Sequence, residues 1–385
     1  MKIVVAPDKF KGSLPATQVA AAIAAGLHAG RPGAEVVTIP VADGGEGTVD
    51  AAVAAGFGRA PLMAAGPAGP AGDPVRTSYA RRGEVAVVEL AGVCGLARRS
   101  GGRCSPRAAP LTASSFGAGE VLRAALEAGA RRIVLGVGGS ASTDGGAGLL
   151  QALGARLLDT RGEPVRPGGA ALRDVATLDL SGLHPGLRAA DVILAADVDN
   201  PLTGPDGAAE VYGPQKGASP PEVDALAAGL RRWAAVVAAA VGRDWSQAPG
   251  AGAAGGVGIA ALAVLGATRR PGIELVLDLA GFEGALDGAD LVITGEGSLD
   301  AQSLAGKTPV GVARAAARHG IGVVAVAGRS TLTEAELAAA GITAVYSLSD
   351  LEPDLERCRA EAARLLRRTG QMIARDRLAE VAAGA

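Results

Sequence analysis

Short apolar segments alternate with amphipathic segments along nearly the whole chain. The first apolar segment, residues 3–6, precedes a helical pattern, and the same order recurs between residues 132 and 347. The amphipathic segments are about 10–15 residues long, which is typical of the helices that connect parallel strands. A helical crossover returns the chain to the same end of the sheet, so consecutive strands pair in parallel. The alternation therefore predicts an α/β fold with mostly parallel sheets.

The same pattern places individual elements. Strands are expected at residues 3–6, 34–41, 75–79, 85–90, 132–137, 191–196, 290–294, 322–327 and 343–347. Helices are expected at residues 15–29, at 117–128, 147–153, 310–319, 334–340 and 351–382, and from Thr48 and Pro221 onward. Ser13 is the expected N-cap of the first helix, with Pro15 in its first turn. The Gly- and Pro-rich residues 56–74 are expected to form a crossing between domains, because 385 residues exceed what one hydrophobic core usually holds.

Composition excludes several classes of protein. Lys and Arg number 37 against 39 Asp and Glu, and 2% of the residues are aromatic, so the basic field and stacking surfaces of nucleic-acid-binding proteins are missing. No apolar run reaches about 18 residues, and the polar N-terminal segment is no signal peptide, so we expect a soluble, cytoplasmic protein. Cys94, Cys104 and Cys358 are too few and too widely spaced for a disulfide framework or a zinc cluster, and the three histidines are equally scattered. Chemistry must therefore rest on carboxylates, lysines, hydroxyls and glycine-rich backbone.

Acidic residues and glycines recur just past the ends of the predicted strands. They are Asp8, Asp43, Gly138 with Gly139, Asp197 with Asp199, residues 295–297 including Glu296, and Gly328. In open α/β sheets, ligands bind at the carboxyl ends of the strands. Any one of these could be an ordinary turn, but their recurrence predicts a binding site at this edge.

Residues 136–141 fit the G-x-G-x-x-A pattern of dinucleotide-binding folds. Further glycines from residue 145 interrupt the helix that such a site requires. A turn that donates backbone N–H groups to a phosphate fits the segment better, with hydroxyls added by Ser140, Ser142 and Thr143.

Residues 301–308 match a phosphate-binding P-loop except at the first position, which is Ala301 instead of glycine. In a P-loop the strand runs directly into that position, whereas here residues 295–300 intervene and Pro309 follows. We therefore expect no P-loop. Lys307, at the start of a helix, can still neutralise phosphate charge, the alternative being a solvated lysine.

The segment after the strand at 191–196 carries two carboxylates, Asp197 and Asp199. Alternation would send both to the same side, and two carboxylates completed by water and substrate phosphates suit Mg²⁺. The residues alone do not distinguish metal ligands from a catalytic base, because two further acidic pairs exist, Asp43 with Glu46 and Glu296 with Asp300.

Lysines are rare in a chain that prefers arginine, which draws attention to those at loop positions. They are Lys9, Lys11, Lys216 and Lys307. Keeping lysine there is consistent with a need for a compact cation.

Seven blocks occur in order along the chain: APDKFKGS at 6–13, PVADGGEGT at 40–48, GGSASTDGGAG at 138–148, DVDNPLTG at 197–204, GPQKG at 213–217, GAGAAGG at 250–256 and TGEGSLD at 294–300. Together they resemble the type I glycerate kinases. The resemblance implies ATP-dependent phosphorylation of D-glycerate with Mg²⁺, most often giving 2-phosphoglycerate. Four positions depart from the family's usual residue and bear on fine substrate preference: Lys9, Thr143, Ser298 and Ala301.

For the fold, the resemblance implies two dissimilar α/β domains, one inserted into the other, with the active-site cleft between them. The predicted division is a discontinuous domain of residues 1–74 and 286–385 and an inserted domain of residues 75–285.

On this basis Asp43, Asp197 and Lys11 are the predicted catalytic residues, with Asp43 and Asp197 the leading candidates for the base. Asp197 and Asp199 are the predicted Mg²⁺ ligands. The predicted substrate- and phosphate-binding residues are Asp8, Ser13, Gly138, Gly139, Ser140, Asp144, Lys216, Gly255, Glu296 and Lys307.

Three alternatives stay open: a kinase for another small hydroxy acid, a glycerate kinase that forms 3-phosphoglycerate, and a non-catalytic sensor of glycerate or nucleotide. The absence of a DNA-binding module or a basic helix from the sequence disfavours the sensor. The expected partners are ATP and D-glycerate, without nucleic acid or membrane, for a monomer or a homodimer.

Overall fold

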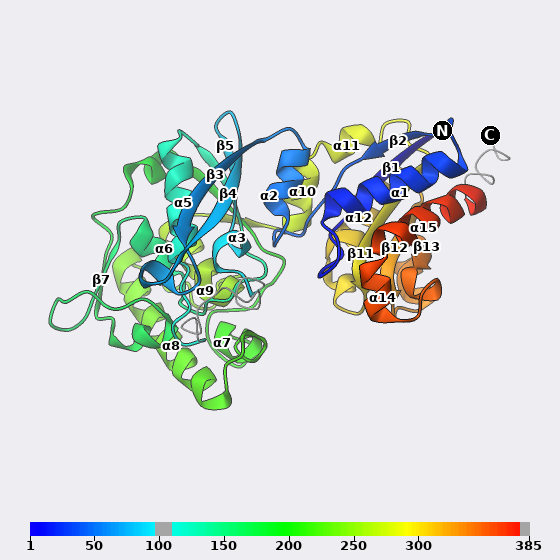
Figure 1. The fold of residues 1–385 in the computed structure, drawn as a ribbon. Helices are drawn as coiled ribbons and strands as arrows, with labels where there is room; N and C mark the ends of the chain where they lie inside the picture. The colour runs from blue at the N-terminus through cyan, green and yellow to red at the C-terminus, as the bar shows by residue number, and fades with distance from the viewer. Residues whose placement is uncertain (97–109, 378–385) are drawn as a thin grey trace. The chain divides into compact units, whose positions relative to one another are not determined.

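The computed structural model describes residues 1–96 and 110–377, so Cys104 lies outside the described residues. The chain divides into two units (Figure 1). The first unit comprises residues 1–43, 50–56 and 273–385, and the second comprises residues 44–49 and 57–272. Each unit contains its own sheet with helices packed on it, and most strand pairs are parallel. The predicted α/β class with mostly parallel sheets is confirmed.

The sheet of the first unit has the strand order β13-β12-β11-β1-β2, and all of its pairs are parallel. Its strands are β1 (Lys2–Pro7), β2 (Glu35–Thr38), β11 (Leu291–Leu299), β12 (Val323–Ser330) and β13 (Ile342–Ser347). In β1, Ile3 and Val5 enter one apolar core while Val4 and Ala6 enter another. Apolar residues on both faces are what a parallel sheet covered by helices on both sides requires.

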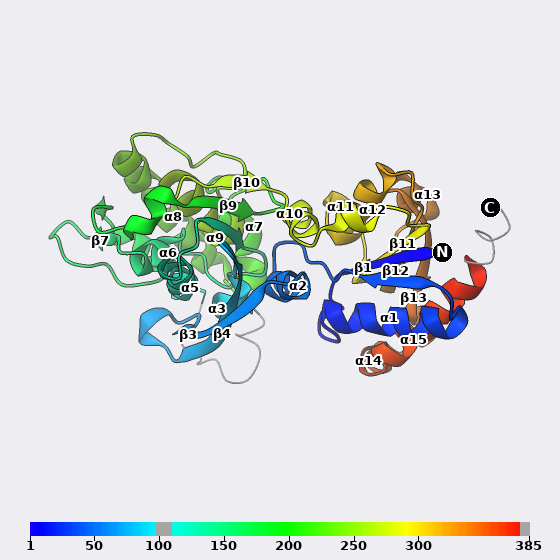
Figure 2. The same ribbon diagram turned by 90° about the horizontal axis from the view of Figure 1, so that it is seen from above.

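Helices from distant parts of the chain cover the two faces of this sheet. On one face α1 (Ala16–Gly30) and α15 (Ala362–Asp376) lie side by side, blue and red in Figure 1. On the other face lies α12 (Thr308–Ala317), as Figure 2 shows. Because β1 leads into α1 and β11 leads into α12, the connections diverge between these neighbouring strands. This is a topological switch point, where the carboxyl ends of α/β strands commonly bind ligands.

The remaining helices of this part of the chain are short. They are α2 (Thr48–Ala54), α10 (Gly272–Leu279), α11 (Phe282–Ala285), α13 (Glu334–Ala339) and α14 (Leu355–Ala360).

The sheet of the second unit has the order β10-β9-β6-β5-β4-β3, parallel from β10 to β5 and antiparallel beyond. Its strands are β3 (Gly58–Ala65), β4 (Pro74–Arg82), β5 (Val85–Glu89), β6 (Arg132–Gly136), β9 (Asp191–Ala195) and β10 (Thr268–Arg270). β7 (Arg156–Leu158) and β8 (Thr177–Asp179) form a separate two-stranded antiparallel sheet. Its helices are α3 (Ala91–Cys94), α5 (Phe116–Glu127), α6 (Ala147–Ala152), α7 (Ala208–Tyr212), α8 (Pro220–Val241) and α9 (Ala253–Ile259). One apolar core, which includes the fully buried Trp233, joins these elements.

The division into units differs from the predicted one at both crossings. Residues 56–74 contain β3, which pairs with β4 and therefore belongs to the second unit. This strand was not predicted, because proline, here Pro61, usually argues against a strand. β3 is an edge strand, where proline is tolerated. At the return, Ile273 and Phe282 enter an apolar core of the first unit, so that unit resumes at residue 273 and not at 286.

Two local predictions also differ from the structure. The N-cap of α1 is Pro15, whereas the hydroxyl of Ser13 donates to the carbonyl of Arg359 at 2.7 Å. The predicted C-terminal helix is divided into α14 and α15, and residues 378–382 of that prediction lie outside the described residues. Among the helices in residues 1–96 and 110–377, none combines the length and the apolar character needed to cross a membrane.

Candidate functional site

Three carboxylates gather near the switch point of the first unit. Asp8 directly follows β1, and its N–H donates to the carbonyl of Gly295 at 2.8 Å, which sets Asp8 beside Glu296 on β11. Beyond β2, the N–H of Val41 donates to the carbonyl of Pro7 at 3.0 Å, so the chain reaches Asp43 alongside the end of β1. The charges of Asp8 and Asp43 both act on Glu296. We call Asp8, Asp43 and Glu296 the acid cluster.

The segment that resembles a P-loop folds onto this cluster. The hydroxyl of Ser303 donates to Oε1 of Glu296, and the hydroxyl of Thr308 donates to Oδ2 of Asp8 at 3.0 Å. On the other side of Asp8, the N–H of Lys9 donates to Oδ1 at 2.6 Å. The hydroxyl of Thr308, which a P-loop would direct to a metal ion, is thus bound to a carboxylate.

Burial shifts the proton equilibria of this cluster. Burial raises the pKa of Asp8 to about 6, with Asp43 adding to the rise and Lys9 opposing it. Burial likewise raises the pKa of Glu296 to about 7, which the hydrogen bond from Ser303 and the charge of Lys307 oppose, while Asp8 and Asp43 add to the rise. Both carboxyl groups therefore titrate closer to neutral pH than ordinary carboxyls do.

In the second unit, the loop after β6 packs against the glycines at 44–45. The N–H of Gly138 donates to the carbonyl of Gly44 at 3.2 Å, and a Cβ on Gly138 would lie 2.7 Å from the Cα of Gly45. Glycine is required at Gly138 because another backbone runs across it. The glycine pattern at 136–141 therefore has a packing cause that does not involve a dinucleotide.

Lys216 lies inside the same unit and is only 3% exposed. Its Nζ donates to the Ser140 hydroxyl at 3.0 Å and to the Ser142 carbonyl at 2.6 Å. Gly255, with φ +68°, passes so close that a Cβ there would lie 2.9 Å from this Nζ. The buried hydroxyl of Thr143 has no hydrogen-bond partner among the described residues. We call Lys216, Ser140, Ser142, Thr143 and Gly255 the buried lysine site.

Asp144 holds the loop next to this site. Its carboxylate accepts hydrogen bonds from the N–H and hydroxyl of Ser115 at 2.7 and 2.9 Å and from the N–H groups of Gly146 and Gly148 at 3.2 and 3.3 Å. The side chain is fully buried, and burial raises its pKa. Asp144 thus ties the N-terminus of α6 to that of α5, and both of its oxygens are engaged, by its own loop and by Ser115.

Asp197 and Asp199, the predicted Mg²⁺ ligands, each contact a group of their own unit. Oδ1 of Asp197 accepts the N–H of Gly272, the first residue of α10, at 2.7 Å. Oδ1 of Asp199 lies 2.6 Å from a guanidinium nitrogen of Arg269, and its side chain is 76% exposed. Across residues 1–96 and 110–377, no group of three or more His, Cys, Asp or Glu side chains is arranged to hold a metal.

Glu89, at the end of β5, accepts backbone N–H groups at the start of a helix, as Asp197 does. Its Oε2 accepts the N–H groups of Gly47 and Val49 at 3.0 and 3.1 Å, at the start of α2. Two carboxylates at the carboxyl edge of the second sheet therefore bind helix N-termini, where negative charge is stabilised by the helix dipole.

The other predicted residues are distributed between the two units. Lys307 precedes α12, with its Nζ 3.4 Å from the side-chain oxygen of Gln302, while Lys11 is exposed in the loop after β1. Gly139 is exposed and has φ +76° in the loop after β6. Sequence reasoning missed the hydrogen bonds that Ser303 and Thr308 donate to the acid cluster, although the near-P-loop pattern marked their segment. Nothing in the sequence pointed to Ser115.

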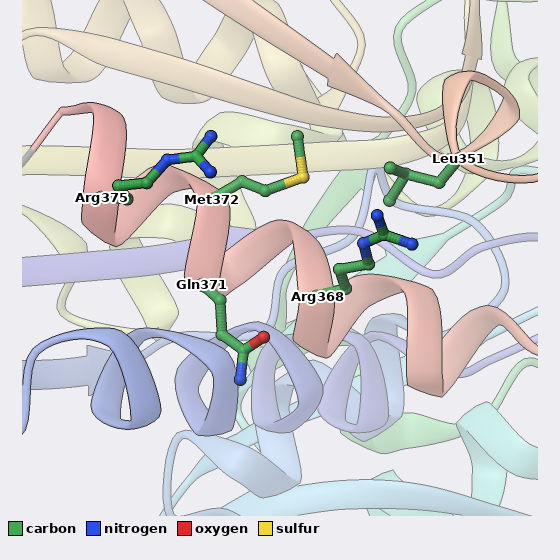
Figure 3. Close-up of a pocket in the computed structure, with 5 residues that line it drawn as sticks. All are labelled: Leu351, Arg368, Gln371, Met372 and Arg375. Atoms are coloured by element: carbon green, nitrogen blue, oxygen red, sulfur yellow. The ribbon is translucent and has the colours of Figure 1, made fainter.

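A cavity of about 440 Å³ lies along α15, and none of the residues above lines it (Figure 3). It is lined by Leu351, Arg368, Gln371, Met372 and Arg375. The two guanidinium groups would favour an anion, but that of Arg375 is already paired with Asp376 at 2.7 Å. The lining offers no carboxylate, hydroxyl or thiol that could take a proton, so we do not place the chemistry there.

The comparisons with known proteins agree along the whole chain. Residues 3–378 match the family model described as the glycerate kinase family. Glycerate kinase from Bacillus subtilis is 44% identical over 378 residues, which cover 97% of each chain, and glycerate 2-kinase from Escherichia coli K12 is 43% identical over 350 residues, which cover 90% of each. A crystal structure described as a glycerate kinase 2, from Salmonella typhimurium LT2, superposes with a TM-score of 0.82 at 42% identity and covers 100% of this chain and 99% of that one. The chain therefore belongs to the glycerate kinase family of enzymes.

Proposed function

We propose that this kinase transfers the γ-phosphoryl group of ATP to the 2-hydroxyl of D-glycerate, which gives 2-phosphoglycerate and ADP. The observation that carries the proposal is the 43% identity to a relative named glycerate 2-kinase over 90% of both chains. The geometry supports it, because phosphoryl transfer needs charge neutralisation and a proton acceptor more than covalent catalysis.

The buried lysine site is the proposed phosphate-binding element. Lys216 supplies a compact positive charge, and the loops that contain Ser140 and Gly255 bring hydroxyl and backbone groups around it. Asp144 keeps that loop in place through its four hydrogen bonds. Lys11 and Lys307 are the proposed additional cations in the first unit.

The acid cluster is the proposed proton-accepting element, and it lies at the position where α/β sheets bind ligands. Asp43 keeps its predicted place in it. The hydrogen bond of Asp197 to Gly272 favours a capping role for that residue over the catalytic role predicted from the sequence.

Magnesium is proposed to arrive with the nucleotide, because Mg²⁺ is usually bound through substrate phosphates and only one or two carboxylates. When bound, it neutralises charge on the triphosphate. The ion pair of Asp199 with Arg269 disfavours Asp197 and Asp199 as its ligand pair.

The test is ADP release from ATP, Mg²⁺ and D-glycerate, with the product offered directly to enolase. Rapid ADP release with direct consumption by enolase is the expected result. Consumption that first requires a phosphoglycerate mutase would instead place the phosphoryl group on the 3-hydroxyl. No ADP above the glycerate-free background would reject glycerate as the substrate, and other small hydroxy acids would then be tried in the same assay.

A further inference from the structure

The loop between β11 and α12 contacts two carboxylates of the acid cluster. Its two hydroxyls, from Ser303 and Thr308, each donate to a different carboxylate of the cluster. Ser303 also accepts the N–H of Asp300 at 3.2 Å, which fixes the hydroxyl at the turn. The loop therefore orients two carboxylates, those of Glu296 and Asp8.

We propose that Glu296 is the catalytic base that takes the proton from the acceptor hydroxyl, and that Ser303 is the positioning residue that orients its carboxylate. This assignment rests on the proposed function, because it presumes an acceptor alcohol and a nucleoside triphosphate.

The contacts of the two carboxylates favour Glu296 over Asp8. Asp8 is 5% exposed, and both of its oxygens already accept hydrogen bonds, Oδ1 from Lys9 and Oδ2 from Thr308. Glu296 is half-buried, and only its Oε1 accepts a hydrogen bond from another described residue. Its Oε2 is left for a substrate hydroxyl. A base must reach the proton that it removes, and Glu296 satisfies this requirement better.

The charges around Glu296 come from three further elements. Asp8 follows β1, Asp43 lies beyond β2, and Lys307 precedes α12, with Lys9 paired to Asp8 at 3.4 Å. The two acids favour the protonated form of Glu296, whereas Lys307 and the Ser303 hydroxyl favour the anion. Burial is the largest influence, and together with these opposing charges it raises the pKa of Glu296 to about 7. A base with a pKa near the working pH is both available as the anion and strong enough to take the proton.

The step balances without any further reactant. The acceptor oxygen forms a bond to the γ-phosphorus while the bond from that phosphorus to the β–γ bridging oxygen breaks. The electron pair of the broken bond leaves on the nucleoside diphosphate. The hydroxyl proton passes to the carboxylate of Glu296, which then releases it to water.

The first experiment compares the pH dependence of kcat and kcat/KM for the wild-type kinase and Glu296→Gln. Glutamine keeps the shape and can still accept the Ser303 hydrogen bond, but it cannot take the proton. We expect kcat to fall by about 100-fold or more, KM for both substrates to change little, and the acidic limb of the profile to disappear. A Glu296→Gln enzyme that keeps the wild-type limb and turnover would overturn the assignment, while wild-type product formation would leave the proposed function standing.

Three variants that keep Glu296 test which neighbours set its pKa. For each of them the direction in which the acidic limb should move is predicted. Ser303→Ala and Lys307→Gln each remove an influence that favours the anion, so the acidic limb should move to higher pH. Asp43→Asn removes a negative charge, so the limb should move to lower pH. If Asp43→Asn instead abolishes turnover and the limb, the base is Asp43 and the proposal fails. These shifts also test the proposal if Glu296→Gln does not fold. An acidic limb that stays at the wild-type pH in all three variants would reject Glu296 as the catalytic base.

Discussion

The acid cluster and the buried lysine site differ in the groups that surround their charged side chains. In the acid cluster, the charges of the carboxylates act on one another, and side-chain hydroxyls donate hydrogen bonds to Glu296 and Asp8. Glu296 keeps one oxygen without a hydrogen bond from the described residues. In the buried lysine site, Lys216 is almost wholly covered and bonds to a carbonyl and a hydroxyl, while neighbouring Asp144 is bound mainly by backbone N–H groups. Neighbouring carboxyl groups raise one another's pKa and can therefore take up a proton near neutral pH. A charged group surrounded by backbone and hydroxyl dipoles is instead held in one position. This difference agrees with the roles proposed above, proton transfer for the acid cluster and charge stabilisation for the buried lysine site.

The largest expected effect follows from removing the fixed charge. Lys216→Met should lower kcat/KM for ATP by about 100-fold or more, because a preorganised cation near the phosphates is lost. Steady-state kinetics with varied ATP measure this, and Ser140→Ala, which removes one hydrogen bond but no charge, is the matched control with a much smaller loss. Normal ATP kinetics in Lys216→Met would mean that the lysine only fills the interior of its unit.

Gly255→Ala probes how tightly the loops close around Lys216. A Cβ would overlap the carbonyl of Ser142 and lie 2.7 Å from the Cα of Thr143, and φ is +68°. We expect a loss of about 3 kcal/mol in the free energy of unfolding, measured by chemical denaturation. Gly320→Ala, at φ +70° with no atom within 4 Å of its Cβ, should cost only about 1 kcal/mol. Equal losses in the two variants would show that backbone conformation alone matters.

Glu296→Gln should change stability with pH in the direction expected for a carboxyl with a raised pKa. The folded protein holds a proton on Glu296 up to about pH 7, which the unfolded chain gives up at lower pH, so the wild type loses stability as pH rises from about 5 to 8. Glutamine does not titrate, so the variant does not lose stability in this way. Its free energy of unfolding should exceed that of the wild type by about 1–3 kcal/mol at pH 8.5, with little difference at pH 4.5. Denaturation at both pH values measures it.

The control for that experiment is Glu222→Gln. Hydrogen bonds from Ser219 lower the pKa of Glu222, so its contribution to stability is lost as pH falls. The two variants should therefore show opposite pH dependence, and the same dependence in both would contradict the shift at Glu296.

The smallest effect is expected at Asp197. Asparagine can still accept the N–H of Gly272 through its side-chain oxygen, although more weakly without the charge. Asp197→Asn should therefore lose less than tenfold in kcat and about 1 kcal/mol of stability. A loss of turnover as large as that of Glu296→Gln would restore Asp197 as a catalytic residue.

Sequence reasoning predicted the strands that carry these sites because their apolar runs are continuous, as parallel sheets require. It also predicted that Asp8, Asp43 and Glu296 follow strand ends. Asp8 and Asp43 do so, whereas Glu296 lies within β11, which extends to Leu299 instead of ending near Thr294. It could not separate them from Asp197, because periodicity locates strands but does not give their order in a sheet. Only the pairing of β1 with β11 shows that Asp8 and Glu296 are neighbours.

The errors have local physical causes. Alternation was extended to Asp197 and Asp199, but β9 ends at Ala195, so both lie in a loop where alternation no longer applies. The position of Ser13 suited an N-cap, yet α1 begins after Pro15 and the hydroxyl of Ser13 bonds to Arg359. Ser303 could not be assigned because its partner Glu296 lies in the preceding strand and the intervening turn was not predictable.

The glycines at 44–47 have a consequence for anyone who wishes to cut this chain into parts. The second unit includes residues 44–49, which precede its main segment in sequence and are separated from it by seven residues of the first unit, residues 50–56. Gly44 accepts the N–H of Gly138, and Glu89 binds the N–H groups of Gly47 and Val49. A gene fragment for residues 57–272 alone would leave a buried glutamate and the loop after β6 without these partners. Residues 57–272 are therefore not expected to fold well as a separate fragment. When segments are recombined between relatives, residues 44–49 and 57–272 are best exchanged together.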